Sequence, residues 1–176
     1  TAREKSPYVN GIDAMTGGAG DGMRLAINIV AMLIVFIAFV AMADAVIGFV
    51  VPGLSLQKIF GWAFSPAAFL MGIEPADVSK VGSLLGAKLA INEHYAYLVM
   101  KGWRATADYM TPRSYTLAAF ALTGFANLAS VGIQLGGIGG IAPERRSDLA
   151  KLGLRALFVG FMATLLNAAI AGVLLE

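Results

Sequence analysis

Three stretches of this chain are too apolar, and too poor in charged side chains, to lie on the surface of a soluble domain. Residues 25–51 contain one charged residue, Asp44, and residues 114–142 and 156–175 contain none. The first stretch would form about 40 Å of α-helix, more than the roughly 30 Å that the hydrocarbon core of a bilayer requires. Only 14% of the 176 residues are charged, against roughly 25% in soluble proteins. The sequence therefore predicts an all-α, multi-pass membrane protein.

The residue content also excludes several classes of function. The chain has no cysteine, which excludes disulfides and thiolate metal sites, and its one histidine, His94, cannot form a histidine-rich metal site. The 13 basic residues lie mostly between the apolar stretches, so they do not form a nucleic-acid-binding surface. Residues 137–142 fit a GxGxxA pattern without a preceding strand, and residues 17–22 lack the Lys-Ser/Thr pair of a phosphate-binding loop. No catalytic set of residues is visible, so we predict neither an enzyme nor a bound cofactor or metal.

The apolar stretches and the polar segments between them divide the chain into two parts. Residues 1–53 are expected to hold a short interfacial helix, within the polar first 24 residues, followed by a long transmembrane helix. Residues 54–176 are expected to begin with another interfacial helix and to end with a last transmembrane helix at about 147–175. Together with the apolar segment at 114–142, this predicts three transmembrane helices. The chain does not start with Met and its polar start is no signal peptide, so we expect that further sequence precedes it.

One segment that is long enough to cross a membrane contains polar residues near its middle. These residues of the segment 81–100 are Lys88, Asn92, Glu93 and His94. An ionised side chain at the bilayer centre costs about 2.5 kcal/mol or more unless it faces a cavity or a partner. We therefore predict a re-entrant helical hairpin at about 77–100, with its tip near Asn92-Glu93 and Glu93 offered to a polar solute. The alternatives are that Glu93 pairs with Lys88 or that it reaches the membrane interface.

The segment 114–141 is uncharged but rich in glycine, and its composition predicts a helix that is broken near Gly124 and Asn127. Asn127 and Ser130 are three residues apart, so they share a face where the helix resumes. Both side chains are candidates to hydrogen-bond a solute that carries hydroxyl groups. The alternative is that Asn127 caps the resumed helix and Ser130 packs against a neighbour, and the two roles are compatible. Phe125 is a candidate to stack on a planar ligand group, although a Phe in a membrane helix more often serves packing.

At these segments the sequence resembles the concentrative nucleoside transporter family. The resembling segments are GAGDGMRLAINIVAML at 18–33, FSPAAFLMGI at 64–73, VGSLLGAKLAINEHYAY at 81–97, LTGFANLASVGIQLGGIGG at 122–140 and APERRSDLAKLGLRAL at 142–157. The combination of an Asn-Glu hairpin tip with a helix that begins GFAN is specific, and the resemblance covers nearly the whole chain.

The resemblance implies a secondary active symporter that carries nucleosides across the bacterial inner membrane, driven by a sodium or proton gradient. It implies elevator-type alternating access in a homotrimer, in which the long helix at 25–51 belongs to the scaffold and lines the trimer interface. Residues 54–176 would form half of the moving transport domain. The groups that contact the base and the coupling ion are expected mainly in sequence that precedes this chain.

The resemblance also implies a substrate site. The glutamate at the hairpin tip of the family and the Asn and Ser of its broken helix contact the ribose hydroxyls, and these residues fall on Glu93, Asn127 and Ser130. The phenylalanine that lies beside the nucleoside in the family falls on Phe125. A vicinal diol offers two donors, and a carboxylate accepts both.

The chain departs from the family pattern at the hairpin tip, where His94 and Tyr95 replace the usual Phe-Val pair, and at Ala129, where the family often has serine. These differences leave the preferred nucleosides open. The distribution of Lys and Arg slightly favours a cytoplasmic N-terminus and a cytoplasmic 143–155 loop. Two alternatives to a nucleoside transporter are a transporter of the same architecture for another polar solute and a non-transporting membrane subunit.

Overall fold

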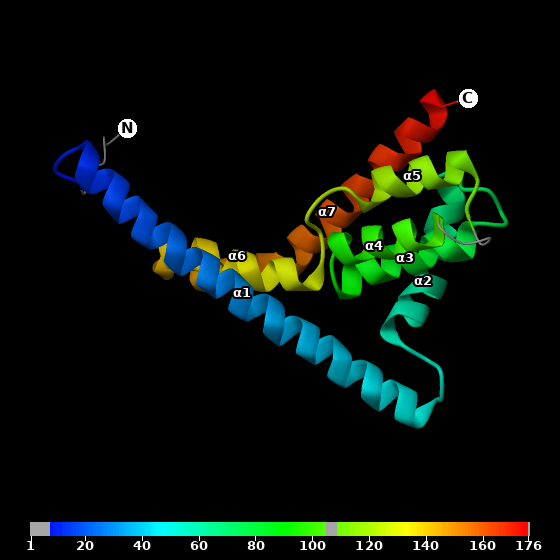
Figure 1. Cartoon of the computed structure of the whole chain (residues 1–176), viewed down its shortest axis with the longest axis horizontal. Helices are drawn as coiled ribbons and strands as arrows, with labels where there is room; N and C mark the ends of the chain where they lie inside the picture. Colours follow the sequence, from blue (N-terminus) through cyan, green and yellow to red (C-terminus); the bar gives the residue numbers. More distant parts are fainter. Residues whose placement is uncertain (1–7, 105–108, 176) are drawn as a thin grey trace.

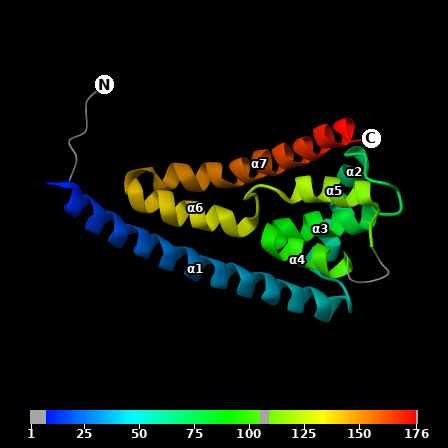
Figure 2. The same ribbon diagram turned by 45° about the horizontal axis from the view of Figure 1, so that its top comes forward.

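The computed structural model describes residues 8–104 and 109–175, and within these ranges the regular structure is entirely helical. Its elements are α1 (Gly11–Val50), α2 (Leu56–Leu70), α3 (Val78–Ala90), α4 (Glu93–Arg104), α5 (Pro112–Leu122), α6 (Leu128–Ile141), a 3-10 turn at Pro143–Arg145, and α7 (Arg146–Leu174). Helix α1 extends along one side of the molecule, and α2 to α5 gather with the C-terminal half of α7 toward the C-terminal end of α1 (Figures 1 and 2). The prediction of an all-α fold is confirmed over the part of the chain that the structure describes.

Helix α1 is one continuous helix of 40 residues, which differs from the expected division into an interfacial helix and a separate transmembrane helix. It begins where the Asn10 side chain accepts a hydrogen bond from the Asp13 backbone N–H at 2.9 Å. The glycines at 17–22 lower helix propensity, but each keeps its backbone N–H and therefore its place in the hydrogen-bond ladder. The helix ends only at Val50, and its C-cap residue Val51 directly precedes Pro52. Loss of polarity along the chain was therefore a poor guide to where this helix begins.

Apolar side chains cover much of the surface of α1. Those exposed by more than half include Ile27, Val30, Ile34, Val35, Phe39 and Met42. Helix α1 runs beside α6 in both views (Figures 1 and 2) and meets it closely at Gly137, where an added Cβ would lie 3.0 Å from the Leu25 side chain. An apolar surface of this extent requires lipid or another protein surface to cover it.

One segment of the described residues, Pro143–Leu174, is both long and apolar enough to cross a membrane. Two shorter apolar helical segments lie at Ile37–Val50 and Leu128–Gly140. The segment that ends with α7 agrees in place with the last expected transmembrane helix. The total of three transmembrane helices stays a prediction.

Helices α2 and α3 pack with almost no side chain between their backbones. A Cβ added to Gly82 would lie 2.5 Å from the Gly61 carbonyl oxygen and 3.1 Å from the Ser65 backbone nitrogen. A Cβ added to Gly86 would lie 2.8 Å from the Gln57 carbonyl oxygen. Close approach of this kind depends on residues without a side chain. The glycines of α3 therefore fix the position of the helix that leads to the predicted hairpin tip.

We expect Gly82→Ala to destabilise the complete protein in detergent, lowering the free energy of unfolding by about 1–3 kcal/mol, because overpacking forces backbones apart. The contacts of the new methyl group would be backbone atoms of α2 and the Ser65 side chain, so rotamer changes alone cannot relieve them. Gly102→Ala in α4 is the matched control, since no described atom lies within 4 Å of its added Cβ. The midpoint of thermal unfolding checks both; equal midpoints for Gly82→Ala and the control would contradict the packing argument.

Two short non-helical connections interrupt the group of helices that follows α2. Helices α3 and α4 lie side by side in both views and are separated only by Ile91 and Asn92 (Figures 1 and 2). Helices α5 and α6 follow each other along α7, separated by residues 123–127. The two helix breaks thus fall where the sequence predicted the hairpin tip and the interruption of the segment 114–141.

Candidate functional site

The two helix breaks meet through one side-chain hydrogen bond. Glu93 is the first residue of α4, and Asn127 is the N-cap of α6. The Asn127 Nδ2 group donates to Glu93 Oε2 at 2.9 Å, although the two residues are 34 positions apart in the sequence. The structure therefore brings the candidate carboxylate and the candidate amide into direct contact.

Local sequence explains why the chain bends at these two places. At the first break, the Asn92 side chain accepts a hydrogen bond from the Tyr95 backbone N–H at 2.8 Å and so caps α4. At the second break, α5 ends at Leu122, the C-cap residue Thr123 is extended, and Gly124 follows with φ +82°. A backbone with this φ is favourable only for glycine among ordinary residues. Asparagine and glycine, rather than polarity alone, therefore shape both breaks.

Asn127 and Ser130 form a capping box at the start of α6. The Asn127 Oδ1 atom accepts from the Ser130 backbone N–H at 2.8 Å. The Ser130 hydroxyl accepts from the Asn127 backbone N–H at 3.3 Å and donates to the Asn127 carbonyl at 2.6 Å. The capping role considered from the sequence is thus confirmed, and it leaves these two side chains 1% and 2% exposed.

Glu93 keeps hydrogen-bonding capacity that its protein neighbours do not use. Within residues 8–104 and 109–175, its Oε2 atom accepts from Asn127, and no protein donor is bonded to Oε1. Glu93 is partly exposed, whereas Asn127 is buried beside it. An ionised carboxylate accepts up to about four hydrogen bonds. The free acceptor positions of Glu93 can therefore receive donors from a solute.

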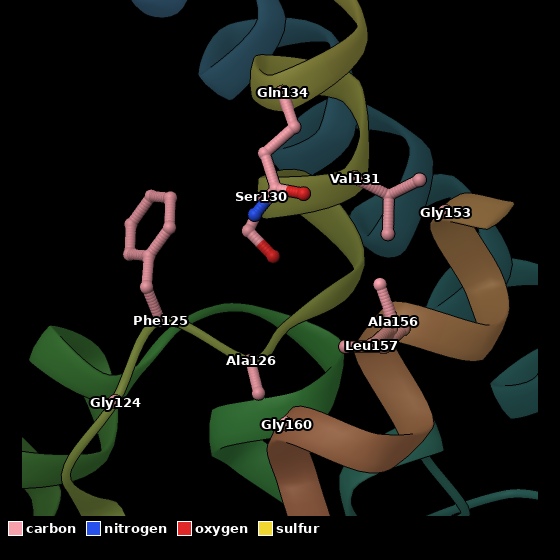
Figure 3. Close-up of a pocket in the computed structure, with 10 residues that line it drawn as sticks. All are labelled: Gly124, Phe125, Ala126, Ser130, Val131, Gln134, Gly153, Ala156, Leu157 and Gly160. Carbon is pink, nitrogen blue, oxygen red and sulfur yellow. The ribbon is translucent and has the colours of Figure 1, made fainter. Parts of the chain in front are cut away.

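A cavity of about 270 Å³ lies beside the second break, between the α5–α6 connection and α7. Figure 3 shows Phe125 and Ser130 on the side of that connection and Gly153, Ala156 and Leu157 on α7. Phe125 is 51% exposed, so its ring is not committed to packing within the described residues. Glu93 and Asn127 do not line this cavity, but Asn127 is joined to its wall through the capping box with Ser130.

The other residues at the hairpin tip, His94 and Tyr95, are both exposed. Within the described residues, the His94 side chain makes no hydrogen bond or ion pair. Gln134, which the sequence analysis did not select, lines the cavity one helical turn beyond Ser130. Its spacing of four residues from Ser130 on the resumed helix was the signal that would have identified it.

Lys88 lies in the same region with partners that the sequence did not reveal. The side chain is fully buried, and its Nζ atom donates to the carbonyl oxygens of Ala121 and Thr123 at 2.9 and 2.8 Å. The third donor position goes to Thr164 Oγ1 at 2.9 Å. The alternative in which Lys88 forms an ion pair with Glu93 is therefore wrong. Backbone carbonyls carry no residue-type signal, which is why sequence spacing did not predict these partners.

The sequence of this chain is similar to those of known transporters. The family model described as "Na+ dependent nucleoside transporter C-terminus" matches residues 1–172. The transporter YutK of Bacillus subtilis is 42% identical over 168 residues, which cover 93% of this chain and 41% of that protein. Human sodium/nucleoside cotransporter 1 is 37% identical over an alignment of 182 positions, which covers 94% of this chain and 28% of that protein. The chain thus spans less than half the length of these relatives.

Solved structures of the transporter CNTnw share the fold. Its outward-facing state, in a variant protein, matches with a TM-score of 0.86 at 37% identity and covers 99% of this chain and 45% of that one. Its inward-facing, substrate-bound state matches with a TM-score of 0.76 at 38% identity, over 98% of this chain and 42% of that one.

Proposed function

Because this chain belongs to the family of Na+-dependent nucleoside transporters and matches the C-terminal part of the family model, we propose that it serves sodium-driven nucleoside symport across the bacterial inner membrane. The names of its relatives favour sodium over protons as the coupling ion, since several are sodium/nucleoside cotransporters. Its relatives are transporters rather than enzymes, which agrees with the absence of a recognisable catalytic motif from the sequence.

The contact between Glu93 and Asn127 is the observation that carries this proposal. Asn127 holds one carboxylate oxygen of Glu93, and the second oxygen is left to accept hydrogen bonds. The two hydroxyls of a ribose are vicinal donors, which suits a carboxylate fixed in this way. Phe125 and Ser130 line the adjoining cavity and are proposed to contact the same nucleoside, Phe125 through its ring.

The proposed membrane arrangement follows from the helix breaks. Helices α3 and α4 would enter and leave the membrane from one side as a re-entrant hairpin, and α5 and α6 would form a broken helix whose interruption meets the hairpin tip. Irregular backbone is tolerated at membrane depth only where protein or water covers it. Binding sites of secondary transporters commonly lie where such broken helices meet. Helix α1 would belong to the scaffold of a homotrimer.

The two states of CNTnw support a moving transport domain. Both states are structures of one protein, yet this chain resembles the outward-facing one with TM-score 0.86 and the inward-facing one with 0.76. The arrangement of the corresponding helices therefore differs between the two states. We propose that residues 54–176 move relative to α1 in an elevator-type transition.

The complete transporter, purified and reconstituted in proteoliposomes, should accumulate radiolabelled uridine when sodium is supplied outside. The matched control is an imposed proton gradient without sodium. We expect it to give no more uridine uptake than vesicles without any ion gradient. Uptake under the proton gradient alone would reassign the coupling ion. The absence of uridine uptake under either gradient, with a different polar solute taken up instead, would contradict nucleoside transport.

A further inference from the structure

We propose that Lys88 is a positioning residue of the proposed nucleoside site. Its side chain holds the end of α5 against the hairpin formed by α3 and α4, so that Glu93 and Asn127 meet. This inference rests on the proposed function, because its readout is the recognition of ribose. Lys88 belongs to α3, whereas its three partners lie at the end of α5 and on α7. One ammonium group therefore joins three elements around the second helix break.

The hydrogen-bond geometry of Lys88 is complete. An ammonium group has three donors, and the Ala121 carbonyl, the Thr123 carbonyl and the Thr164 hydroxyl take one each at 2.8–2.9 Å. The Phe161 ring lies 5.3 Å from Nζ and covers the group from another side. Thr164 is itself fixed, because its hydroxyl donates to the Phe161 carbonyl at 2.8 Å. A fully buried lysine with these partners has a defined position rather than a mobile head group.

The partners of Lys88 are groups that the helix break would otherwise leave without donors. The last carbonyls of a helix have no partner within that helix. At the end of α5, the Ala119 carbonyl accepts from the Tyr97 hydroxyl of α4 at 2.8 Å. The Ala121 and Thr123 carbonyls accept from Lys88. Side chains from both helices of the hairpin thus complete the interrupted end of α5.

The charges of the hairpin match the polarity of the four helix ends. Lys88 lies in the last turn of α3 and faces the end of α5, and the C-terminus of a helix favours a cation. Glu93 lies in the first turn of α4 and bonds the N-cap of α6, and the N-terminus of a helix favours an anion. At the break between α5 and α6, the hairpin therefore places a cation, Lys88, at the end of α5 and an anion, Glu93, at the start of α6. Loss of the cation would release the end of α5 and so shift Asn127 relative to Glu93, although the side chains of both residues stay chemically unchanged.

The test compares uridine with 2′,3′-dideoxyuridine, which lacks the two ribose hydroxyls, as ligands of the complete transporter in detergent. We expect Lys88→Met to reduce the preference for uridine, taken as the ratio of the two dissociation constants, by at least tenfold. A general loss of protein stability would weaken the binding of both ligands equally and leave this ratio unchanged. Lys101→Met is the matched control, because Lys101 is exposed in α4 and we expect it to keep the wild-type ratio.

Thr164→Val is the second variant, for the case in which Lys88→Met does not fold. It removes one acceptor of Lys88, keeps the shape of the side chain and leaves the lysine in place. We expect a smaller reduction of the ratio, of about twofold to fivefold. An unchanged ratio in Lys88→Met, or in Thr164→Val where only that variant folds, would overturn the role of Lys88. The proposed function would still stand if the wild-type protein prefers uridine and Glu93→Gln reduces that preference. A wild-type protein that binds both ligands equally would overturn the proposed function and the role of Lys88.

Discussion

Glu93→Gln should weaken uridine binding to the complete transporter by at least 100-fold, as measured by isothermal titration calorimetry. The substitution keeps the size of the side chain and an oxygen for Asn127, which donates to Glu93 at 2.9 Å. It replaces the second carboxylate oxygen, proposed to receive the ribose hydroxyls, by an NH₂ group that cannot accept their hydrogen bonds. Hydrogen bonds to a charged group contribute about 1.5–3 kcal/mol each, so two of them account for the expected loss.

The matched control for this loss is Glu144→Gln. Glu144 lies in the exposed turn between α6 and α7, so the control removes the same charge far from the helix breaks. We expect it to bind uridine as the wild type does. Wild-type affinity in Glu93→Gln would remove this residue from the site, and the assignment of the ribose site to the hairpin tip would then have to be abandoned.

Gly124→Ala should both destabilise the protein and reduce uridine affinity by at least tenfold. The backbone of Gly124 has φ +82°, and a conformation of this kind costs residues with a side chain about 1–3 kcal/mol. The added Cβ would also lie 2.7 Å from Thr164 Cγ2. Thr164 cannot turn away without breaking its bonds to Lys88 and to the Phe161 carbonyl. The connection that carries Phe125 and Asn127 would therefore be displaced.

The two causes of this effect can be separated with a double variant. Thr164→Ser removes the obstructing methyl group but keeps the hydroxyl that binds Lys88. Added to Gly124→Ala, it should recover part of the affinity and of the thermal midpoint, and the remaining deficit measures the backbone strain. Gly102→Ala again serves as the control, because the space around its added Cβ is open. Full affinity in Gly124→Ala alone would show that the break does not need this conformation.

The sequence was a good guide to where helices break and a poor one to what holds the breaks together. Asn92 and Gly124 interrupt apolar segments that are otherwise long enough to cross a membrane, and the structure has its breaks at both. Uncharged stretches of this length leave few alternatives to helices in lipid. The start of α1 was misplaced, because loss of polarity and the beginning of a helix are separate events.

The candidate site required more than local pattern. Spacing placed Asn127 and Ser130 on one face and allowed Asn127 to cap the helix, and the structure adds that the Ser130 side chain bonds back to Asn127 in a capping box. Spacing alone gives no reason for Asn127 to meet Glu93, 34 residues away; that pairing came from the resemblance to a family. The sequence offers only Glu93 as a partner of Lys88, because the carbonyl groups that accept from Lys88 belong to the backbone and have no signal in the sequence.

The way in which Lys88 and Tyr97 complete the end of α5 limits how the proposed transport domain can change shape. Moving the hairpin away from that end would leave the buried ammonium group of Lys88, and the carbonyl groups of α5 that it binds, without hydrogen-bond partners. Leaving a buried charged group without its hydrogen-bond partners costs several kcal/mol. In the proposed elevator-type transition of residues 54–176, we therefore expect α3 and α4 to keep their contacts with the end of α5 and with α7, and the movement to take place relative to α1.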